Sequence, residues 1–146
     1  MKKTIITGGS GKLGKSFKKV FKNALFPSHS ELDITNIISI SSYFKRHKTD
    51  SVIHAAAITH VRQCDANKKF AWNVNVKGTI NLINELQKQK DPPYFILIST
   101  PCVFDGISSP FNEDSVPNPK NYYGLTKLAQ EVALQSSGLK NWLIVR

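Results

Sequence analysis

The chain has 146 residues, of which 40% are hydrophobic, and it carries a formal net charge of +10. This composition excludes a disordered chain, and the length predicts one domain with a core of its own. The lysines are spread along the sequence and form no compact basic block, so we interpret the charge as a solvated surface.

The cysteines and the apolar runs bear on the compartment. Cys64 and Cys102 are the two cysteines, too few for a disulfide framework, which is typical of a reducing compartment. The N-terminal apolar run is too short for a signal peptide, and no run approaches transmembrane length. We therefore expect a soluble, cytoplasmic protein with no membrane partner.

Short apolar runs alternate with helical patterns along the chain. The spacing predicts strands over 4–7, 24–26, 51–57, 94–100 and 141–146, and helices over 12–23, 34–48, 66–89 and 125–137. The runs read as strands are apolar throughout and do not alternate with polar residues, which indicates a parallel sheet covered on both faces. We therefore predict an α/β fold, a doubly wound Rossmann-type parallel sheet with strand order 3-2-1-4-5 and helices on both faces.

The first predicted strand passes directly into a glycine-rich turn, TGGSGKLG at residues 7–14, which leads into the first helix. Gly8 permits a tight turn, Gly11 lets the backbone approach a pyrophosphate, and Gly14 permits close packing of helix on strand. The free N–H groups and the dipole of the helix N-terminus favour the same anion. The pattern predicts a dinucleotide site, although a plain strand-to-helix turn also accounts for glycines. The cofactor contacts assigned to the turn are Gly8, Ser10, Gly11, Lys12, Leu13 and Gly14.

The residues after the second predicted strand bear on which dinucleotide binds. Asp33 has nearly the separation from Gly14 at which such folds place an acid on the ribose, but it lies beyond the end of the strand. Ser28 and His29 follow the strand end itself. Neither side chain repels a 2′-phosphate as a carboxylate would, which favours NADP(H), with NAD(H) left as the alternative.

The stretch NYYGLTK, residues 121–127, places two tyrosines before a lysine. Each helical residue advances by about 100°, so Tyr123 and Lys127 share one face whereas Tyr122 and Lys127 point apart. A phenol with a pKa of about 10 is a poor acid–base catalyst at neutral pH. A nearby ammonium and an oxidised nicotinamide lower that pKa, so we predict Tyr123 and Lys127 as a functional pair.

Six motifs together resemble the extended, sugar-nucleotide branch of the short-chain dehydrogenase/reductase superfamily. In chain order they are TGGSGKLG, ELDIT, HAAA, NVKGTINL, ISTPCVFDG and YGLTK. Within that branch, the details LDITN, AAAIT and PNPKNYYGLTKLAQE are most similar to the dTDP-4-dehydrorhamnose reductases. The resemblance spans nearly the whole chain.

The resemblance implies roles for individual residues. Thr100 would hold the substrate carbonyl, with the neighbouring Ser99 as the fallback. Tyr123 would donate the proton to the carbonyl oxygen, and Lys127 would lower the pKa of Tyr123 and bind the nicotinamide ribose. Asn75 would help to order the site. Further cofactor contacts are implied for Asp33, Ile34, Ala55, Ala56 and Ala57.

The implied activity is hydride transfer from NADPH to a 4-keto sugar nucleotide. Residues 1–146 would then be an NAD(P)-binding Rossmann domain whose C-terminal substrate domain is absent, and a chain of this length is expected to be inactive alone. Two alternatives stay open: a sugar-nucleotide epimerase with bound NAD, and a non-catalytic dinucleotide-sensing subunit. A homodimer also stays open. A nucleic-acid binder is disfavoured, because the aromatic residues fall on apolar faces and do not interleave with the lysines.

Some residues depart from the resemblance or lie outside it. Pro101 and Cys102 replace an acid and an aromatic residue of the reductases, and the lack of two acids here argues against dehydration. Cys102 is a candidate base for carbon epimerisation, with a buried inert cysteine as the alternative. His54, His60 and Cys64 fit no standard zinc spacing, so we interpret them as loop residues and expect no metal.

Overall fold

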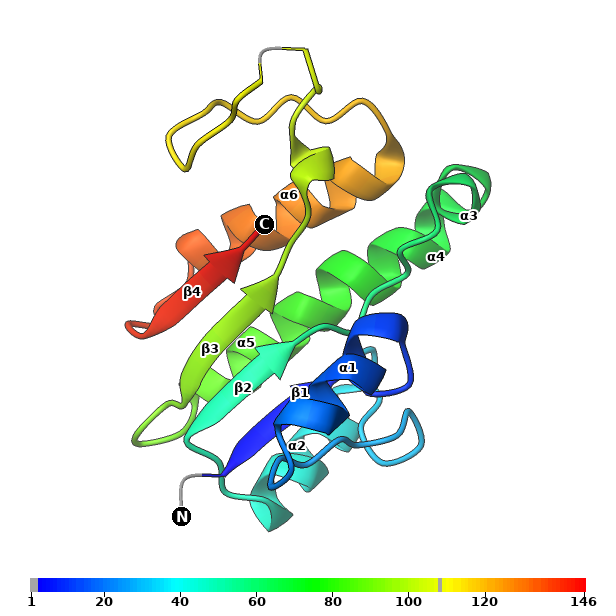
Figure 1. Ribbon diagram of the computed structural model, residues 1–146. Coiled ribbons are helices and arrows are strands. Elements are labelled where there is room, and N and C mark those ends of the chain that lie inside the picture. Colours follow the sequence, from blue (N-terminus) through cyan, green and yellow to red (C-terminus); the bar gives the residue numbers. More distant parts are fainter. Residues whose placement is uncertain (1–2, 108) are drawn as a thin grey trace.

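The computed structural model describes residues 3–107 and 109–146, and its centre is a parallel sheet (Figure 1). The strands, in spatial order, are β1 (Thr4–Thr7), β2 (Ser51–His54), β3 (Tyr94–Ile98) and β4 (Trp142–Val145). Within the described part of the chain, no helix has the length and apolar character needed to span a membrane.

Helices lie on both faces of this sheet, as predicted. In chain order they are α1 (Lys12–Val20), α2 (Ile37–Arg46), α3 (Val61–Ala66), α4 (Lys68–Trp72), the π-helix η1 (Asn73–Lys77), α5 (Gly78–Gln87), the 3₁₀-helix η2 (Pro101–Val103) and α6 (Tyr122–Gln135). In Figure 1, α1 lies on one face, and α2, α5 and α6 lie on the other.

The strand order corrects one prediction. Leu25 makes an isolated parallel bridge with Ile5 at the outer edge of β1, while β2 pairs with the opposite edge. The strand predicted over 24–26 is reduced to this one bridge, and its place beside β1 gives the order 2-1-3-4-5 and not 3-2-1-4-5 in the numbering of the five predicted strands. The reason is burial: Val52 and His54 are almost completely buried and need a central strand, whereas Leu25 is only half-buried and suits an edge.

The hydrophobic core lies between the sheet and the helices α2, α5 and α6, which cover one face of the sheet. Its fully buried members are Ile5, Val52, Phe95 and Leu97 from the strands, and Ile40, Leu82, Leu86 and Leu134 from the helices. The other face of β4 is less covered than predicted, because Leu143 and Val145 keep 47% and 41% of their surface exposed. In Figure 1, α1 lies on that face, near β1 and β2.

The turn between β1 and α1 depends on two glycines for different reasons. Gly8 has a φ of +76°, and a Cβ there would lie 2.7 Å from the backbone of Ala55 and Ala56. At Gly14 the backbone has an ordinary conformation, but a Cβ would lie 2.3 Å from the Gly8 carbonyl oxygen and 2.6 Å from the Gly9 Cα. The turn therefore folds back onto the first residues of α1 and presses against the segment after β2.

We expect Gly14→Ala to lower the free energy of unfolding by about 1–3 kcal/mol, the usual cost of overpacking against atoms that cannot move away. Urea denaturation followed by circular dichroism measures it. Gly11→Ala is the matched control, because its Cβ would meet only the Gly8 oxygen, at 3.4 Å. The control should lose less than about 1 kcal/mol. Equal stability of the two variants would contradict this account of the turn.

Candidate functional site

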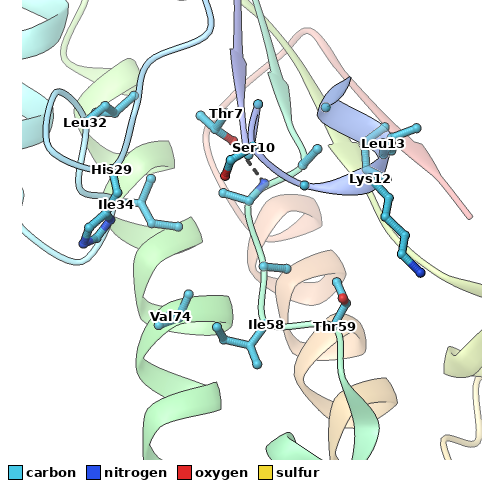
Figure 2. Close-up of a pocket in the computed structure, with 18 of the residues that line it drawn as sticks. Thr7, Ser10, Lys12, Leu13, His29, Leu32, Ile34, Ile58, Thr59 and Val74 are labelled. Carbon is cyan, nitrogen blue, oxygen red and sulfur yellow. Dashed lines mark hydrogen bonds between the residues drawn. The ribbon is translucent and has the colours of Figure 1, made fainter. Parts of the chain in front are cut away.

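The reversal of strand order places a cleft at the carboxyl ends of β1 and β2. Leu25 pairs with one edge of β1, and β2 pairs with the other edge. The loops that follow β1 and β2 therefore diverge. A cleft of about 870 Å³ opens there (Figure 2). This volume lies within the range of pockets that hold small molecules and cofactors.

Most residues predicted to contact a cofactor line this one cleft. They are Gly8, Ser10, Gly11, Lys12, Leu13, Gly14, His29, Asp33, Ile34, Ala55, Ala56, Ala57, Tyr123 and Lys127. Three predicted residues do not line it: Ser28, Asn75 and Thr100. Figure 2 shows Lys12 of the glycine turn on one side, His29 and Ile34 on the other, and Ile58 and Val74 below them.

The sequence analysis missed several lining residues, among them Thr7, Leu32, Ile58, Thr59 and Val74. Ile58 and Thr59 directly follow the three alanines in the motif AAAIT, so continuing that motif by two residues would have found them. Thr7 could have been found as the last residue of the first strand. Leu32 and Val74 come from separate segments and carried no local signal.

The positive side of the cleft is the N-terminus of α1. The helix begins at Lys12, and its first turn has no acidic residue. Its unpaired N–H groups and its dipole therefore face the cleft without a competing carboxylate, which favours an anion such as a pyrophosphate.

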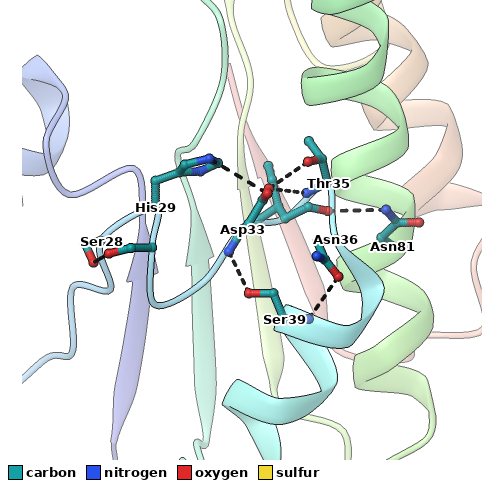
Figure 3. Close-up of polar contacts among 9 residues, drawn as sticks. Ser28, His29, Asp33, Thr35, Asn36, Ser39 and Asn81 are labelled. Carbon is teal, nitrogen blue, oxygen red and sulfur yellow. Dashed lines mark hydrogen bonds and ion pairs between the residues drawn. The ribbon is translucent and has the colours of Figure 1, made fainter.

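The opposite rim is held by its own hydrogen bonds (Figure 3). The Asp33 carboxylate accepts from the Thr35 N–H at 2.8 Å and from the Thr35 hydroxyl at 2.7 Å, and its other oxygen lies 3.8 Å from His29 Nε2. The Ser28 hydroxyl donates to Glu31 at 2.8 Å and does not reach the cleft. His29 therefore remains at the rim, whereas Ser28 serves the loop.

The helix α6 brings Tyr123 and Lys127 to the cleft on one face, as the helical spacing predicts. The helix begins at Tyr122, three residues earlier than predicted, because the Asn121 side chain caps it by accepting from the Gly124 N–H at 2.7 Å. Tyr123 and Lys127 keep only 9% and 3% of their surface exposed. The Lys127 ammonium donates to the Ile98 carbonyl at 2.7 Å, at the end of β3.

Burial governs the titration of both groups. It raises the pKa of Tyr123, and a hydrogen bond with Thr100 only partly offsets this effect. It lowers the pKa of Lys127 to about 8, against the attraction of Glu131. The expected lowering of the tyrosine pKa is therefore not what the protein alone shows: the phenol is protonated, and the ammonium is held by a backbone carbonyl.

The two candidate hydroxyls, Ser99 and Thr100, are distinguished by their partners. The Ser99 hydroxyl donates to the buried Glu131 carboxylate, which also binds the Arg146 guanidinium at 2.7 Å and 3.2 Å. The Thr100 hydroxyl accepts from the Cys102 N–H at 3.2 Å, and hydrogen bonding with Thr100 acts to lower the pKa of Tyr123. Thr100 is thus the hydroxyl that acts on the phenol, although Ser99, and not Thr100, lines the cleft. Glu131 was missed, although it lies four residues after Lys127 on the same helical face.

Asn75 acts on the site from outside the cleft. It lies in η1, where the long helix predicted over 66–89 is interrupted, and it is fully buried. Its side chain accepts from the Ile58 N–H at 2.7 Å and donates to the Ile58 carbonyl at 3.0 Å and to Thr126 Oγ1 at 2.9 Å. Asn75 therefore ties the segment after β2 to α6. Single π-turns inside helices occur frequently at functional sites.

The interpretation of His54, His60 and Cys64 as loop residues is wrong for two of them. His54 ends β2 and is 1% exposed, and Cys64 lies in α3 and is fully buried; only His60 lies outside an element, just before α3. The imidazole of His54 is buried among Thr7, Thr79 and Phe95. In residues 3–107 and 109–146, no group of three or more His, Cys, Asp or Glu side chains is arranged to hold a metal.

The two cysteines are free thiols. Burial raises the pKa of Cys64, whose sulfur lies 3.4 Å from the Ile58 carbonyl oxygen. Cys102 is partly buried and packs with Cys64 and Tyr123. A thiol with a raised pKa is a poor nucleophile, so Cys64 is a packing residue, while the role of Cys102 as a base stays a prediction.

Comparison with known proteins places this cleft in a family. The whole chain, residues 1–146, matches the family described as the RmlD substrate binding domain. A dTDP-4-dehydrorhamnose reductase of Aggregatibacter actinomycetemcomitans is 31% identical over 150 residues, covering 99% of this chain and 50% of that protein. The methionine adenosyltransferase 2 subunit beta of Xenopus tropicalis is 32% identical over 144 residues, covering 91% of this chain and 42% of that protein.

A solved structure agrees with these relatives. The crystal structure of the dTDP-4-dehydrorhamnose reductase of Bacillus anthracis str. Ames in complex with NADP superimposes with a TM-score of 0.90 at 30% identity, covering 100% of this chain and 53% of that one. The chain spans about half the length of the proteins that it matches. The resemblance drawn from the six motifs is confirmed, and the chain belongs to the RmlD substrate binding domain family.

Proposed function

We propose that this chain is the NADP(H)-binding part of a nucleotide-sugar reductase, which reduces a 4-keto sugar by hydride transfer with Tyr123 as the proton donor. The observation that carries the proposal is the convergence of two distant segments. The glycine turn at residues 8–14 and the pair Tyr123 and Lys127 line the same cleft. The names of the related reductases, and the NADP in one of their structures, support the choice of reaction and cofactor.

The residues present fit a dinucleotide. Close packing requires glycine at Gly8 and Gly14, but a Cβ at Gly11 would meet nothing nearer than the Gly8 oxygen at 3.4 Å. The protein's own packing therefore does not explain Gly11, whereas close approach of the protein backbone to a pyrophosphate would. On the facing wall of the cleft, Ala55 to Ala57 have equally small side chains, which leave room for a ligand.

The side chains of the site divide the chemistry. Bound NADPH supplies the hydride. Tyr123 is protonated at neutral pH, since burial raises a pKa that is ordinarily about 10, and it holds the proton that the carbonyl oxygen receives. The Thr100 hydroxyl, which acts on the pKa of Tyr123, would hydrogen-bond the same oxygen. Lys127, with a pKa of about 8, is charged at neutral pH and stabilises the phenolate left behind.

A second candidate is a non-catalytic dinucleotide-sensing subunit. The similarity to a methionine adenosyltransferase 2 subunit beta favours it, because that protein is named as a subunit of an enzyme. The complete set of Thr100, Tyr123 and Lys127 favours the reductase, since a sensor does not need a proton donor beside a buried ammonium. Turnover of a sugar substrate separates the two functions.

We expect NADPH to bind more tightly than NADH. His29 stands at the rim, where one oxygen of the Asp33 carboxylate binds Thr35 and the other lies 3.8 Å from His29 Nε2. A hydrogen bond to a charged group contributes about 1.5–3 kcal/mol, so His29→Ala should weaken NADPH binding by roughly 10-fold or more and leave NADH nearly unchanged. Fluorescence titration of the two reduced cofactors measures both affinities. Equal affinities in the original chain, or tighter NADH, would refute the assignment of this rim to the 2′-phosphate.

In the full-length protein, Tyr123→Phe should lower kcat for a dTDP-4-keto sugar by about 10²–10⁴-fold, the usual contribution of a positioned acid, with little change in NADPH affinity. Tyr122→Phe is the matched control, since Tyr122 is the preceding residue of α6 and does not line the cleft. Oxidation of NADPH, followed by absorbance with the sugar present, reports the rate. Turnover retained by Tyr123→Phe would remove Tyr123 from the mechanism.

A further inference from the structure

A buried polar chain crosses the interior between the cleft and α6. Its centre is His54, which is 1% exposed. Nδ1 of the imidazole lies 2.7 Å from Thr7 Oγ1 on β1, and Nε2 lies 2.9 Å from Thr79 Oγ1 on α5. Neither the proton transfer nor the cofactor contacts described above use this imidazole.

The hydrogen-bond directions define the tautomer. The Thr79 hydroxyl gives its only proton to the Asn75 carbonyl at 2.6 Å, so it can only accept from His54. Nε2 of His54 must therefore carry a proton. Burial lowers the pKa of His54 to about 3, so the ring is neutral and Nδ1 accepts from the Thr7 hydroxyl. Thr7 Oγ1 in turn accepts from the Ala56 N–H at 3.2 Å.

One end of this chain lies at the cofactor cleft. Thr7 and Ala56 both line it, and Ala56 belongs to the wall that faces the glycine turn. The chain of donors runs from the Ala56 N–H through Thr7 to His54, and from His54 through Thr79 to the Asn75 carbonyl. Every hydroxyl along this path both accepts and donates, so each position depends on the next.

The other end lies on α6. The Gln130 side-chain nitrogen donates to the Asn75 carbonyl at 2.7 Å and also to Thr79 Oγ1. The Asn75 side chain donates to Thr126, and the Thr126 hydroxyl donates to the Tyr123 carbonyl at 2.7 Å. Two contacts of the chain thus flank Lys127 on α6, at positions 126 and 130.

The orientation of the Gln130 side chain is determined by this chain of hydrogen bonds. Its Oε1 is buried and, among the residues that the structure describes, is without a hydrogen-bond partner. Turning the amide over would remove the hydrogen bonds that its nitrogen donates to the Asn75 carbonyl and to Thr79 Oγ1. An orphaned buried acceptor is costly, so the amide keeps this orientation because its nitrogen holds two members of the chain.

We propose that His54 is a positioning residue, which sets the wall of the cofactor cleft relative to the helix that carries Tyr123 and Lys127. The proposal deepens the proposed function and rests on it. A buried imidazole between two hydroxyls is an expensive way to fill a core strand, because an apolar side chain would need no partners. What the imidazole adds is a rigid link with two directional ends, and alignment of reacting groups is sensitive to small displacements.

The first experiment examines the imidazole itself in the original chain. In a ¹⁵N-histidine sample, nitrogen chemical shifts of the side chains identify the tautomer and the protonation of each ring. We expect His54 to be neutral with the proton on Nε2 at pH 7 and to stay so at pH 5. A proton on Nδ1, or protonation between pH 7 and pH 5, would overturn the network as described.

The second experiment breaks the chain with an isosteric change in the full-length protein. Thr79→Val removes the hydroxyl that joins His54 to Asn75, and Thr79→Ser restores it. Thr4→Val is the control, because Thr4 and Ser51 make the same kind of side-chain bridge, at 2.8 Å, at the opposite end of β1 and β2. We expect Thr79→Val to lower kcat by roughly 10-fold or more while the KM for NADPH changes by less than about 3-fold, since alignment is lost and binding is kept.

The outcomes separate the two proposals. The full-length protein without substitutions is expected to reduce the sugar. If it does, but Thr79→Val leaves kcat unchanged or Thr4→Val lowers kcat equally, the positioning role is overturned and the proposed reductase function stands. If no sugar is reduced, titration with NADPH followed by NMR still tests the hydrogen-bond network, independently of catalysis. The Gln130 side-chain amide should then shift with NADPH in the original chain and in Thr79→Ser but not in Thr79→Val. If the Gln130 side-chain amide does not shift with NADPH in the unsubstituted protein, the positioning role is overturned as well.

Discussion

The close approach of the backbone at Gly8 to the backbone at Ala55 and Ala56 determines where the rest of the site lies. At this contact there is no room for a side chain. It holds the ends of β1 and β2 together at the point where the strand order reverses, and the loops beyond them diverge. The cleft is the space between those loops. Everything proposed for this chain depends on that space being lined by backbone and small side chains.

Buried polar groups constrain the interior next to the cleft, as the glycines constrain the turn between β1 and α1. Lys127, Glu131, Asn75 and His54 are each nearly inaccessible, and each has a defined partner. Burying such groups is unfavourable unless the partners are in place, so the interior has few alternative arrangements. That constraint explains why the raised pKa of Tyr123 and the lowered pKa of Lys127 occur side by side.

Many of the residues assigned to the cleft could be predicted because their signals are local. Gly8, Gly11 and Gly14 occupy one strand-to-helix turn, and Tyr123 and Lys127 occupy one helical turn, so backbone periodicity alone relates them. The assignments that failed or were missed depend on distant segments. Ser28 was expected at the cofactor but is held by Glu31, and the order of the strands around β1 could not be read from their spacing.

The sequence by itself determined the class of fold, the glycine turn between the first strand and the first helix, and the placement of Tyr123 and Lys127 on one helical face, because each follows from the spacing of neighbours along the chain. Only the tertiary structure decided that Thr100, and not Ser99, acts on the phenol, since the Ser99 hydroxyl donates to Glu131, which also binds Arg146. The same holds for His54, whose partners come from positions 7 and 79. Contacts of this kind depend on which segments the packed sheet and helices bring together, and no local pattern encodes that.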